Sequence, residues 1–186
     1  MPDGGCINLA TPKYVTGADS VAATLLFKNN NIDYSTLRYQ RVILNDSIRT
    51  GPNAGVYQHV FAVKYYNGLP VLSSTFGHHF FKGVFQSVSP MPPASINLSN
   101  TPNLTLPALR QTYISAAAAN HATFNSADAC LAAQFGYFDL NAGSGSSVAN
   151  YVKAWVVTPA NADYPMAIIR DDDGSVLYYV SGIILF

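Results

Sequence analysis

Four histidines are the side chains of this chain best suited to bind a metal ion or to transfer a proton. His78 and His79 are adjacent in a predicted strand, so they point to opposite faces of a sheet and cannot bind the same ion. His121 is distant in the sequence. His59, in the preceding predicted strand, either makes a polar contact at an interface or packs against its neighbours. A protein zinc site needs three or four converging ligands, so we predict no metal site.

The sequence also contains no recognisable set of residues for nucleophilic or acid–base catalysis. The chain contains no glutamate, which excludes the His-Glu-x-x-His motif of zinc peptidases. No Gly-x-Ser-x-Gly motif occurs, and Cys130 has Asp128 nearby but no basic neighbour to activate its thiol. Asp171, Asp172 and Asp173 lack the spaced oxygens and final Glu of an EF-hand, so we interpret them as a solvated turn rather than Ca²⁺ ligands. We predict no catalytic residue and no cofactor.

The composition limits the partners. Charged residues make up 11% of the chain and the net charge is zero, whereas an average protein has about 25% charged residues. Nucleic acid binding needs clustered cations, so nucleic acid is not an expected partner. No stretch approaches the run of about 18 apolar residues that a membrane-spanning helix needs, so we predict no transmembrane segment.

The pair Asn67-Gly68 separates two β-rich runs and is the strongest local signal in the sequence. Both central residues of a type I′ turn have positive φ, which Asn tolerates and Gly adopts freely, so we predict a tight hairpin here. Lys82-Gly83 predicts a second tight turn. The strands expected around these turns cover residues 37–48, 56–66, 69–81 and 84–89.

Two amphipathic helices are predicted, one in each half of the chain. The first begins at Thr16 or Asp19 and ends near Asn29, and the second begins after Thr105, with Pro107 in its first turn, and ends near Asn120. The apolar face expected to point inward from the first helix consists of Ala18, Val21, Ala22, Leu25 and Leu26. The later predicted strands cover residues 135–140, 151–158, 167–170 and 176–180.

The residues around the first turn resemble a known family. A strand that begins with His59 leads into Tyr-Tyr-Asn-Gly-Leu-Pro-Val at residues 65–71. This run is similar to the Tyr-(Asn/Gln)-Gly-(Ile/Leu)-Pro-Val hairpin of the propeptide module of thermolysin-like and fungalysin-like metallopeptidases. The resemblance covers about residues 58–90. It implies a module that holds a peptidase inactive, helps it fold or binds protein outside the cell, and without a zinc motif the chain is not itself the peptidase.

A second resemblance concerns the other half of the chain. Ala-Trp-Val-Val at residues 154–157, with the Asp-Asp-Gly turn that follows, is similar to the PepSY domain, which accompanies that propeptide module. Together the resemblances imply an α+β fold of two modules, each with a helix on an antiparallel sheet in a cystatin-like layering. The expected divisions are an N-terminal tail 1–15, a propeptide-like module 16–90, a Pro-rich connector 91–105 and a PepSY-like module 106–186.

Aromatic residues crowd the central hairpin, and strand alternation must place some of them on the sheet face away from the helix. Such an open aromatic face is a binding surface, unless the second module or another copy of the chain covers it. Both alternatives stay open. The predicted binding surface consists of Tyr65, Tyr66, Asn67, Gly68, Leu69, Phe76 and Phe81.

Cys6 and Cys130 are the only cysteines. They either form a disulfide that ties the N-terminal tail to the second half, as an exported protein permits, or remain two separate thiols. Spacing in the sequence does not decide between these alternatives, because it does not place the two Cα atoms within bonding distance.

Our leading hypothesis is a non-catalytic, extracytoplasmic protein-binding module from a bacterium. Its expected partner is a secreted zinc metallopeptidase, for which it is a stand-alone inhibitor or chaperone, or another envelope protein. We expect a periplasmic, secreted or lipid-anchored surface protein whose signal peptide was removed upstream of Met1. The alternative is a surface lipoprotein that has a structural role or binds a small apolar or glycan ligand.

Overall fold

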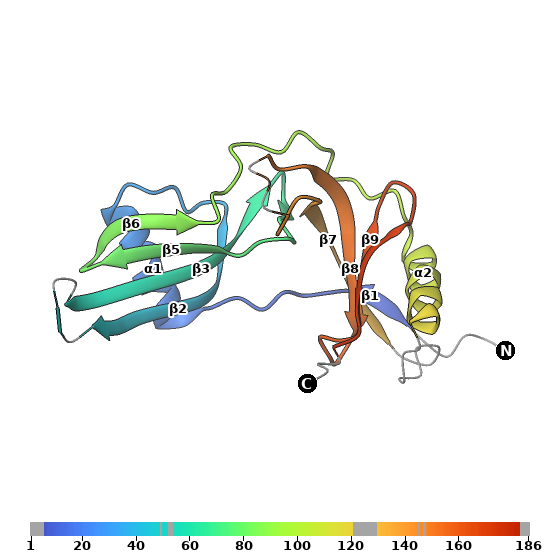
Figure 1. Ribbon diagram of the computed structural model, residues 1–186, viewed down its shortest axis with the longest axis horizontal. Helices are drawn as coiled ribbons and strands as arrows, with labels where there is room; N and C mark the ends of the chain where they lie inside the picture. Colours follow the sequence, from blue (N-terminus) through green and yellow to red (C-terminus); the bar gives the residue numbers. More distant parts are fainter. Residues whose placement is uncertain are drawn as a thin grey trace. The chain divides into compact units, whose positions relative to one another are not determined.

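The computed structural model describes residues 6–48, 50–51, 54–120, 130–144, 146 and 148–182 (Figure 1). These residues form two compact units. We call the described residues of 12–97 and 141–149 the hairpin unit, and those of 1–11, 98–140 and 150–186 the terminal unit. Two helices and ten strands occur in the described part of the chain, in mostly antiparallel sheets, which confirms the predicted α+β class. His121 and Asp128 lie outside the described residues.

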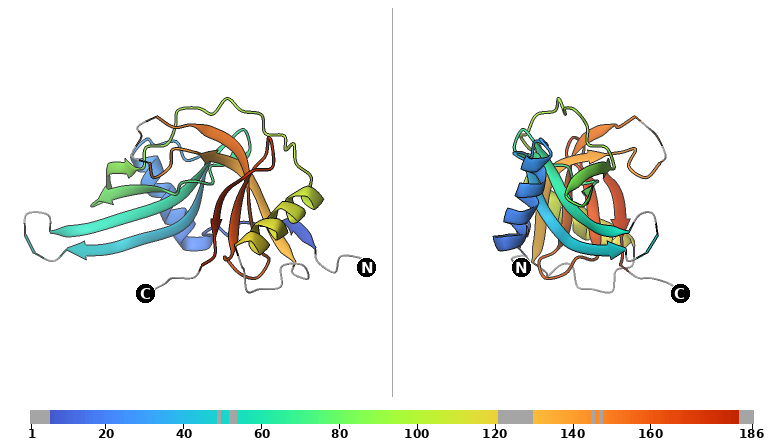
Figure 2. Two further views of the ribbon diagram at one scale, coloured as in Figure 1. Left: turned by 45° about the vertical axis from the view of Figure 1, so that its right-hand side comes forward. Right: turned by 90° about the vertical axis from the view of Figure 1, so that its left-hand side faces the viewer.

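In the hairpin unit one helix covers one face of a sheet. The elements are α1 Gly17–Asn29, β2 Leu37–Ile48, β3 Gly55–Tyr66, β4 Leu69–Pro70, β5 Phe76–Phe81 and β6 Val84–Ser89. The strand order is β2-β3-β5-β6, and β4 pairs with β3. Helix α1 lies behind this sheet in the view of Figure 1 and to its left in the right-hand view of Figure 2. The buried core between them consists of Ala23, Phe27, Leu37, Tyr39, Val60, Ala62 and Phe80.

Helix α1 turns a different face to the sheet from the predicted one. Phe27 is fully buried, whereas Val21 and Leu25 are 61% and 51% exposed. The helix is apolar on several sides, so its own periodicity does not select one face. The ring of Phe27 stacks on Tyr39 with the centroids 5.7 Å apart, and this packing sets the orientation. The expected inward face was therefore wrong for Ala18, Val21 and Leu25, which are exposed, whereas Leu26 does pack against the core.

Both predicted turns are confirmed, but the strand between them is interrupted. Asn67 and Gly68 have φ angles of 49° and 83°, and the pair at Lys82 has the same left-handed geometry. The predicted single strand 69–81 is instead split into β4 and β5. Pro70 lacks an N–H group to continue the ladder, and the chain leaves β3 before β5 pairs further along it.

The terminal unit also has one helix on one sheet. Its elements are β1 Ile7–Leu9, α2 Leu106–Ala119, β7 Leu131–Asp139, β8 Tyr151–Pro159, β9 Met166–Arg170 and β10 Val176–Val180. The strand order is β1-β7-β8-β9-β10. The core under α2 consists of Leu109, Tyr113, Leu131, Ala133, Trp155, Val157, Ala167 and Ile169.

Strand β1 departs from the sequence prediction. It pairs in parallel with β7, with Ile7 opposite Leu131, so this sheet is not wholly antiparallel. Residues 7–9, which were expected in an N-terminal tail, therefore contribute an edge strand. The chain passes from the hairpin unit to the terminal unit between Asn97 and Leu98, within the predicted connector.

Helix α2 lies close to its predicted limits. Thr105 Oγ1 accepts a hydrogen bond from Ala108 N at 3.4 Å, and Pro107 occupies the first turn, where no N–H partner is needed. Leu109 and Tyr113, one turn apart, are fully buried. Neither α1 nor α2, the helices of the described residues, has the length and apolar character to cross a membrane.

Candidate binding surface on the open face of the hairpin unit

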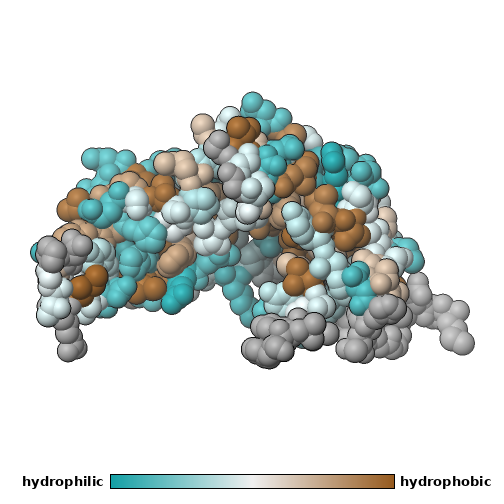
Figure 3. Space-filling model, viewed as in Figure 1, coloured by the Kyte–Doolittle hydropathy of each residue, from teal (hydrophilic) through white to brown (hydrophobic). Residues whose placement is uncertain are grey.

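The face of the hairpin sheet that points away from α1 carries a strip of partly exposed rings. Strand pairing places Tyr57 opposite Phe81, His59 opposite His79, and Phe61 opposite a glycine. Directly opposed residues share one face of an antiparallel sheet, so the five rings lie together. We call Tyr57, His59, Phe61, His79 and Phe81 the aromatic strip. Figure 3 looks onto this face, where apolar residues lie among polar ones.

The rings of the aromatic strip contact one another. The centroids of Tyr57 and Phe81 are 4.8 Å apart, and Tyr57 stacks nearly parallel to His59 at 6.3 Å. Phe61 meets His79 edge-on at 6.2 Å. These contacts hold the rings in place before a partner binds. Because each ring side chain has only two rotatable bonds, little conformational entropy is lost on binding.

Two glycines make room for these rings. A Cβ atom on Gly55 would lie 2.5 Å from the Phe81 ring, so the backbone there must be bare for the ring to pack over it. A Cβ on Gly77 would lie 3.2 Å from both Phe61 Cε1 and His79 Nε2. The positions of the rings on this face therefore depend on glycine at two places in the sheet.

Cations flank the aromatic strip. The guanidinium of Arg41 lies 5.9 Å from the centre of the Phe61 ring, and the Lys82 ammonium lies 4.9 Å from the centre of the Phe81 ring. The carboxylate of Asp46 is directed to His59 at 3.2 Å. The two cations keep the ends of the strip positive.

Asp46, His59 and His79 form a hydrogen-bonded chain. His59 Nε2 lies 3.2 Å from Asp46 Oδ2, and His59 Nδ1 lies 2.7 Å from His79 Nδ1. When His59 donates its Nε2–H to Asp46, its Nδ1 accepts the Nδ1–H of His79. Burial, and to a smaller extent the neighbouring His59, lowers the pKa of His79. Two neutral imidazoles satisfy this chain, whereas protonation of both rings would set their Nδ1–H groups against each other.

Two members of the predicted binding surface lie on opposite faces of strand β5. Phe76 is 1% exposed and pairs with Ala62 on the core face, so its assignment to the surface was wrong. Phe81 belongs to the aromatic strip. The two residues are five positions apart in one strand, and an odd spacing cannot place both on the same face.

The remaining predicted residues lie at the hairpin tip. The Tyr65 hydroxyl bonds to the Tyr14 hydroxyl, and the Tyr66 hydroxyl donates to the carbonyl of Pro93. Asn67 and Gly68 are exposed at the turn, and Leu69 is partly exposed. The Asn67 side chain donates to the Ile96 carbonyl at 3.3 Å. The tip is thus anchored to the segment that follows β6 and is separate from the aromatic strip.

The sequence prediction did not include Tyr57 and Phe61 in the binding surface. Their alternation with His59 in one strand was a signal that could have found them, because residues two apart share a face. What the sequence did not supply was the pairing that sets His79 and Phe81 beside them.

The structure joins Cys6 to Cys130 in a disulfide within the terminal unit, with their Cα atoms 4.4 Å apart. The amide of Leu131 donates to the Cys6 carbonyl at 2.7 Å, which extends the β1–β7 pairing up to the disulfide. The bond therefore fastens the edge strand β1 to the sheet.

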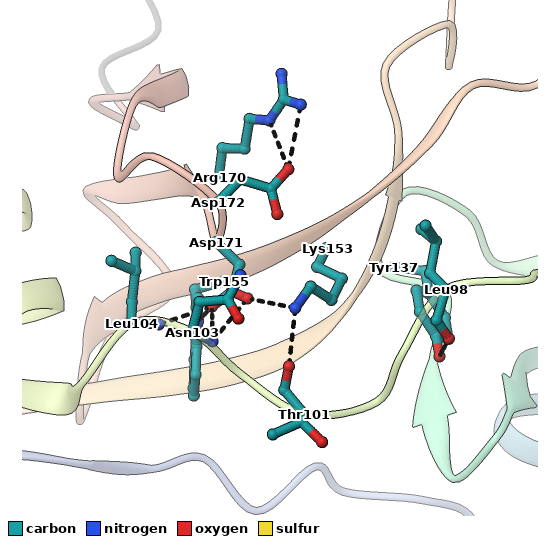
Figure 4. A network of polar contacts seen from close by, with 10 residues as sticks. All are labelled: Leu98, Thr101, Asn103, Leu104, Tyr137, Lys153, Trp155, Arg170, Asp171 and Asp172. Carbon is teal, nitrogen blue, oxygen red and sulfur yellow. Dashed lines mark hydrogen bonds and ion pairs between the residues drawn. The ribbon is translucent and has the colours of Figure 1, made fainter.

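A second polar cluster lies in the terminal unit and is buried. Asp171, 0% exposed, forms an ion pair with Lys153 at 3.0 Å and accepts a hydrogen bond from Trp155 Nε1 at 2.9 Å (Figure 4). It also accepts from the amides of Asn103 and Leu104. The interpretation of Asp171 as part of a solvated turn was wrong, because four donors, namely the Lys153 ammonium, the Trp155 indole and the two amides, compensate the burial of its charge.

The next two acidic residues do face solvent. Asp172 pairs with Arg170 at 3.2 Å, and Asp173 accepts from the amide and hydroxyl of Ser175. Within the described residues no group of three or more His, Cys, Asp or Glu side chains could hold a metal ion. The buried cluster around Asp171 fixes the loop before α2 to the sheet and is structural.

Comparison of the chain with protein-family models, with curated proteins and with solved structures finds no match. Its fold and site define an α+β protein with an open aromatic sheet face.

Proposed function

We propose that this protein is a non-catalytic, exported binding module whose hairpin unit holds another protein against the aromatic strip. The proposal rests on one observation, namely that five rings lie together, partly exposed, on the sheet face that α1 leaves uncovered. Tyrosine, phenylalanine and arginine are enriched at protein interfaces, and tyrosine and arginine are among the residues that most often dominate their binding energy. A fixed strip of rings flanked by a guanidinium has that composition.

The charges on this face favour one kind of partner. Arg41 and Lys82 stand over rings at the ends of the strip, while Asp46 is paired with His59. A partner that offers apolar side chains to the rings and carboxylates to the two cations would complement the face. The chain has no net charge, so nucleic acid is a poor candidate for this role.

The class of partner comes from the resemblance of the hairpin to metallopeptidase propeptides. We infer a secreted zinc metallopeptidase, which this module inhibits or helps to fold. The type I′ geometry at Asn67 and Gly68 supports the comparison of the hairpins, because it is the turn that such a sequence requires. The disulfide between Cys6 and Cys130 supports export, since disulfides persist in oxidising compartments.

The test is capture of zinc peptidases from the secreted and envelope proteins of the source organism, followed by an activity assay on the captured enzyme. The variants Phe81→Ala and Arg41→Gln should each weaken binding by about tenfold or more. Tyr178→Ala is the matched control, because Tyr178 is an exposed aromatic of the terminal unit at 47%. Capture that fails, or that responds equally to the control variant, would contradict the proposal.

A further inference from the structure

A cavity of about 310 Å³ opens beside the first residues of strand β2, in the hairpin unit alone. Its walls come from the segment before α1, from one flank of α1, and from the loop before β2 together with the first three residues of β2. The side chains that matter for its chemistry are Tyr14, Ser20, Thr24, Tyr34, Arg38 and Tyr39. Ligand pockets measure roughly 300–1,000 Å³, so this volume suits a small ligand of one ring.

One cation lies in the wall, in a fixed orientation. Arg38 Nη1 donates to the carbonyls of Leu37 at 2.8 Å and Ser35 at 3.2 Å, and the guanidinium lies 5.5 Å from the centre of the Tyr65 ring. No carboxylate occurs among the described residues that line the cavity. Asp33, on the same loop, accepts instead from the Ser35 amide at 2.9 Å. The wall therefore offers an anion a preoriented partner without a competing acid.

The hydroxyl groups are also oriented. Thr24 Oγ1 donates to the Ser20 carbonyl at 2.9 Å, so in its contact with the Tyr39 hydroxyl at 3.2 Å it must accept. With its own proton donated, the Tyr39 oxygen is an acceptor for a ligand hydroxyl. Tyr39 is held by stacking on Phe27, and Tyr14 by its bond to the Tyr65 hydroxyl. Burial raises the pKa of Tyr14, which stays a neutral hydroxyl.

We propose that this cavity binds a small carboxylate that also carries hydroxyl groups on a ring, of which a hexuronic acid is the simplest representative. Arg38 pairs with the carboxylate, the tyrosine, serine and threonine hydroxyls exchange hydrogen bonds with the ring hydroxyls, and the aromatic walls contact the apolar face of the ring. The proposal concerns a different surface from the aromatic strip and does not depend on a peptidase partner.

The experiment is a titration of the whole chain with galacturonate and with glucuronate, followed by calorimetry and by NMR of backbone amides. The neutral sugar galactose is the ligand control, and it should bind about tenfold more weakly, because it lacks the charge that Arg38 recognises. The largest shifts should fall at the amides of Tyr34, Arg38 and Tyr39.

Arg38→Gln and Arg41→Gln form a matched pair of variants. Both arginines belong to β2 and both lie over an aromatic ring, but only Arg38 lines the cavity. Arg38 is exposed, so its replacement should leave the fold intact, which circular dichroism checks. Arg38→Gln should weaken uronate binding about tenfold while Arg41→Gln leaves it unchanged. Equal binding of galactose and uronate, an equal loss in both variants, or no binding at millimolar uronate would overturn the proposal.

Discussion

The substitution Asp171→Asn should remove much of the stability of the terminal unit. The carboxylate accepts from Lys153 Nζ at 3.0 Å, from Trp155 Nε1 at 2.9 Å, and from two amides of the loop before α2. Asparagine keeps the shape but has one oxygen in place of two, and it carries no charge. Lys153, 8% exposed, would then be buried with the Thr101 carbonyl at 2.8 Å as its remaining acceptor in this cluster.

The magnitude follows from the burial of both partners. Loss of one member of a buried ion pair costs about 3–5 kcal/mol, because the other charge remains uncompensated, and hydrogen bonds to a charged group contribute about 1.5–3 kcal/mol each. Asparagine still accepts some of these bonds, so we expect the free energy of unfolding to fall by about 3–4 kcal/mol. This is a large part of the stability of a typical domain.

Urea denaturation followed by circular dichroism and by fluorescence measures this loss. Trp155 is the single tryptophan of the chain and lies in the cluster, so its emission reports on the terminal unit. Asp172→Asn is the matched control, because its partner Arg170 is at the surface and exposed ion pairs contribute less than about 1 kcal/mol. If the two variants lost the same stability, the argument from the buried charge would be refuted.

Two further comparisons isolate the charge. Lys153→Met should cost less in the Asp171→Asn background than in the wild type, because the orphaned cation is then removed. Burial raises the pKa of Asp171, but the hydrogen bonds from Trp155, Leu104, Asn103 and Lys153 outweigh it and hold the pKa below its usual value. The wild type should therefore lose stability as the pH falls from about 4 through the lower folded pKa, and the variant should lack this component.

Three other predictions test separate features. Gly68→Val should cost on the order of 1–2 kcal/mol by thermal melting, because valine is strained at a φ of 83° in open space; an unchanged midpoint would show that the turn tolerates the side chain. Reduction of the Cys6–Cys130 disulfide, which joins residues 124 positions apart, should lower the free energy of unfolding by about 2–5 kcal/mol in urea titrations. An unchanged free energy would show that the disulfide does not stabilise the protein by restricting its unfolded chain. Burial lowers the pKa of His78 and His79, so their contribution to stability should be complete above about pH 6.5 and should decrease as the pH drops below it. A free energy of unfolding that increases as the pH is lowered from about 7 to about 5.5 would contradict this argument.

The hairpins could be predicted from the sequence because their chemistry is local. Asn67-Gly68 specifies its turn through the φ angles that these two residues tolerate, whatever the rest of the chain does. The odd spacing of Phe76 and Phe81 already excludes one of the two from the surface, but which one is excluded is decided nonlocally. If the hairpin continued from the pairing of Tyr66 with Leu69, Phe76 would lie opposite His59, but the interruption after Pro70 sets it opposite Ala62. A slip of three residues exchanges the two faces of a strand.

The buried cluster and the orientation of α1 were also beyond local signals. Asp171 begins a run of acidic residues that indicates a turn, and the donors that neutralise it come from a strand and a loop distant in the sequence. Helix α1 has apolar residues on several sides, so its own sequence does not show that Phe27 rather than Leu25 faces the core. Packing against the sheet decides between the two. The cavity beside Arg38 could not be predicted from the sequence, because its walls come from three segments that meet only in the folded protein.

The pairing of β1 with β7 sets an order on the folding of this protein. A ribosome releases residues 12–97, which contain every helix and strand described in the hairpin unit, before it has made β7. Domains generally fold as units while the chain is still growing. The first described residues must therefore wait, unpaired and with a free thiol at Cys6, until a partner 124 positions later emerges. Until Cys130 emerges, an oxidant would meet the Cys6 thiol alone.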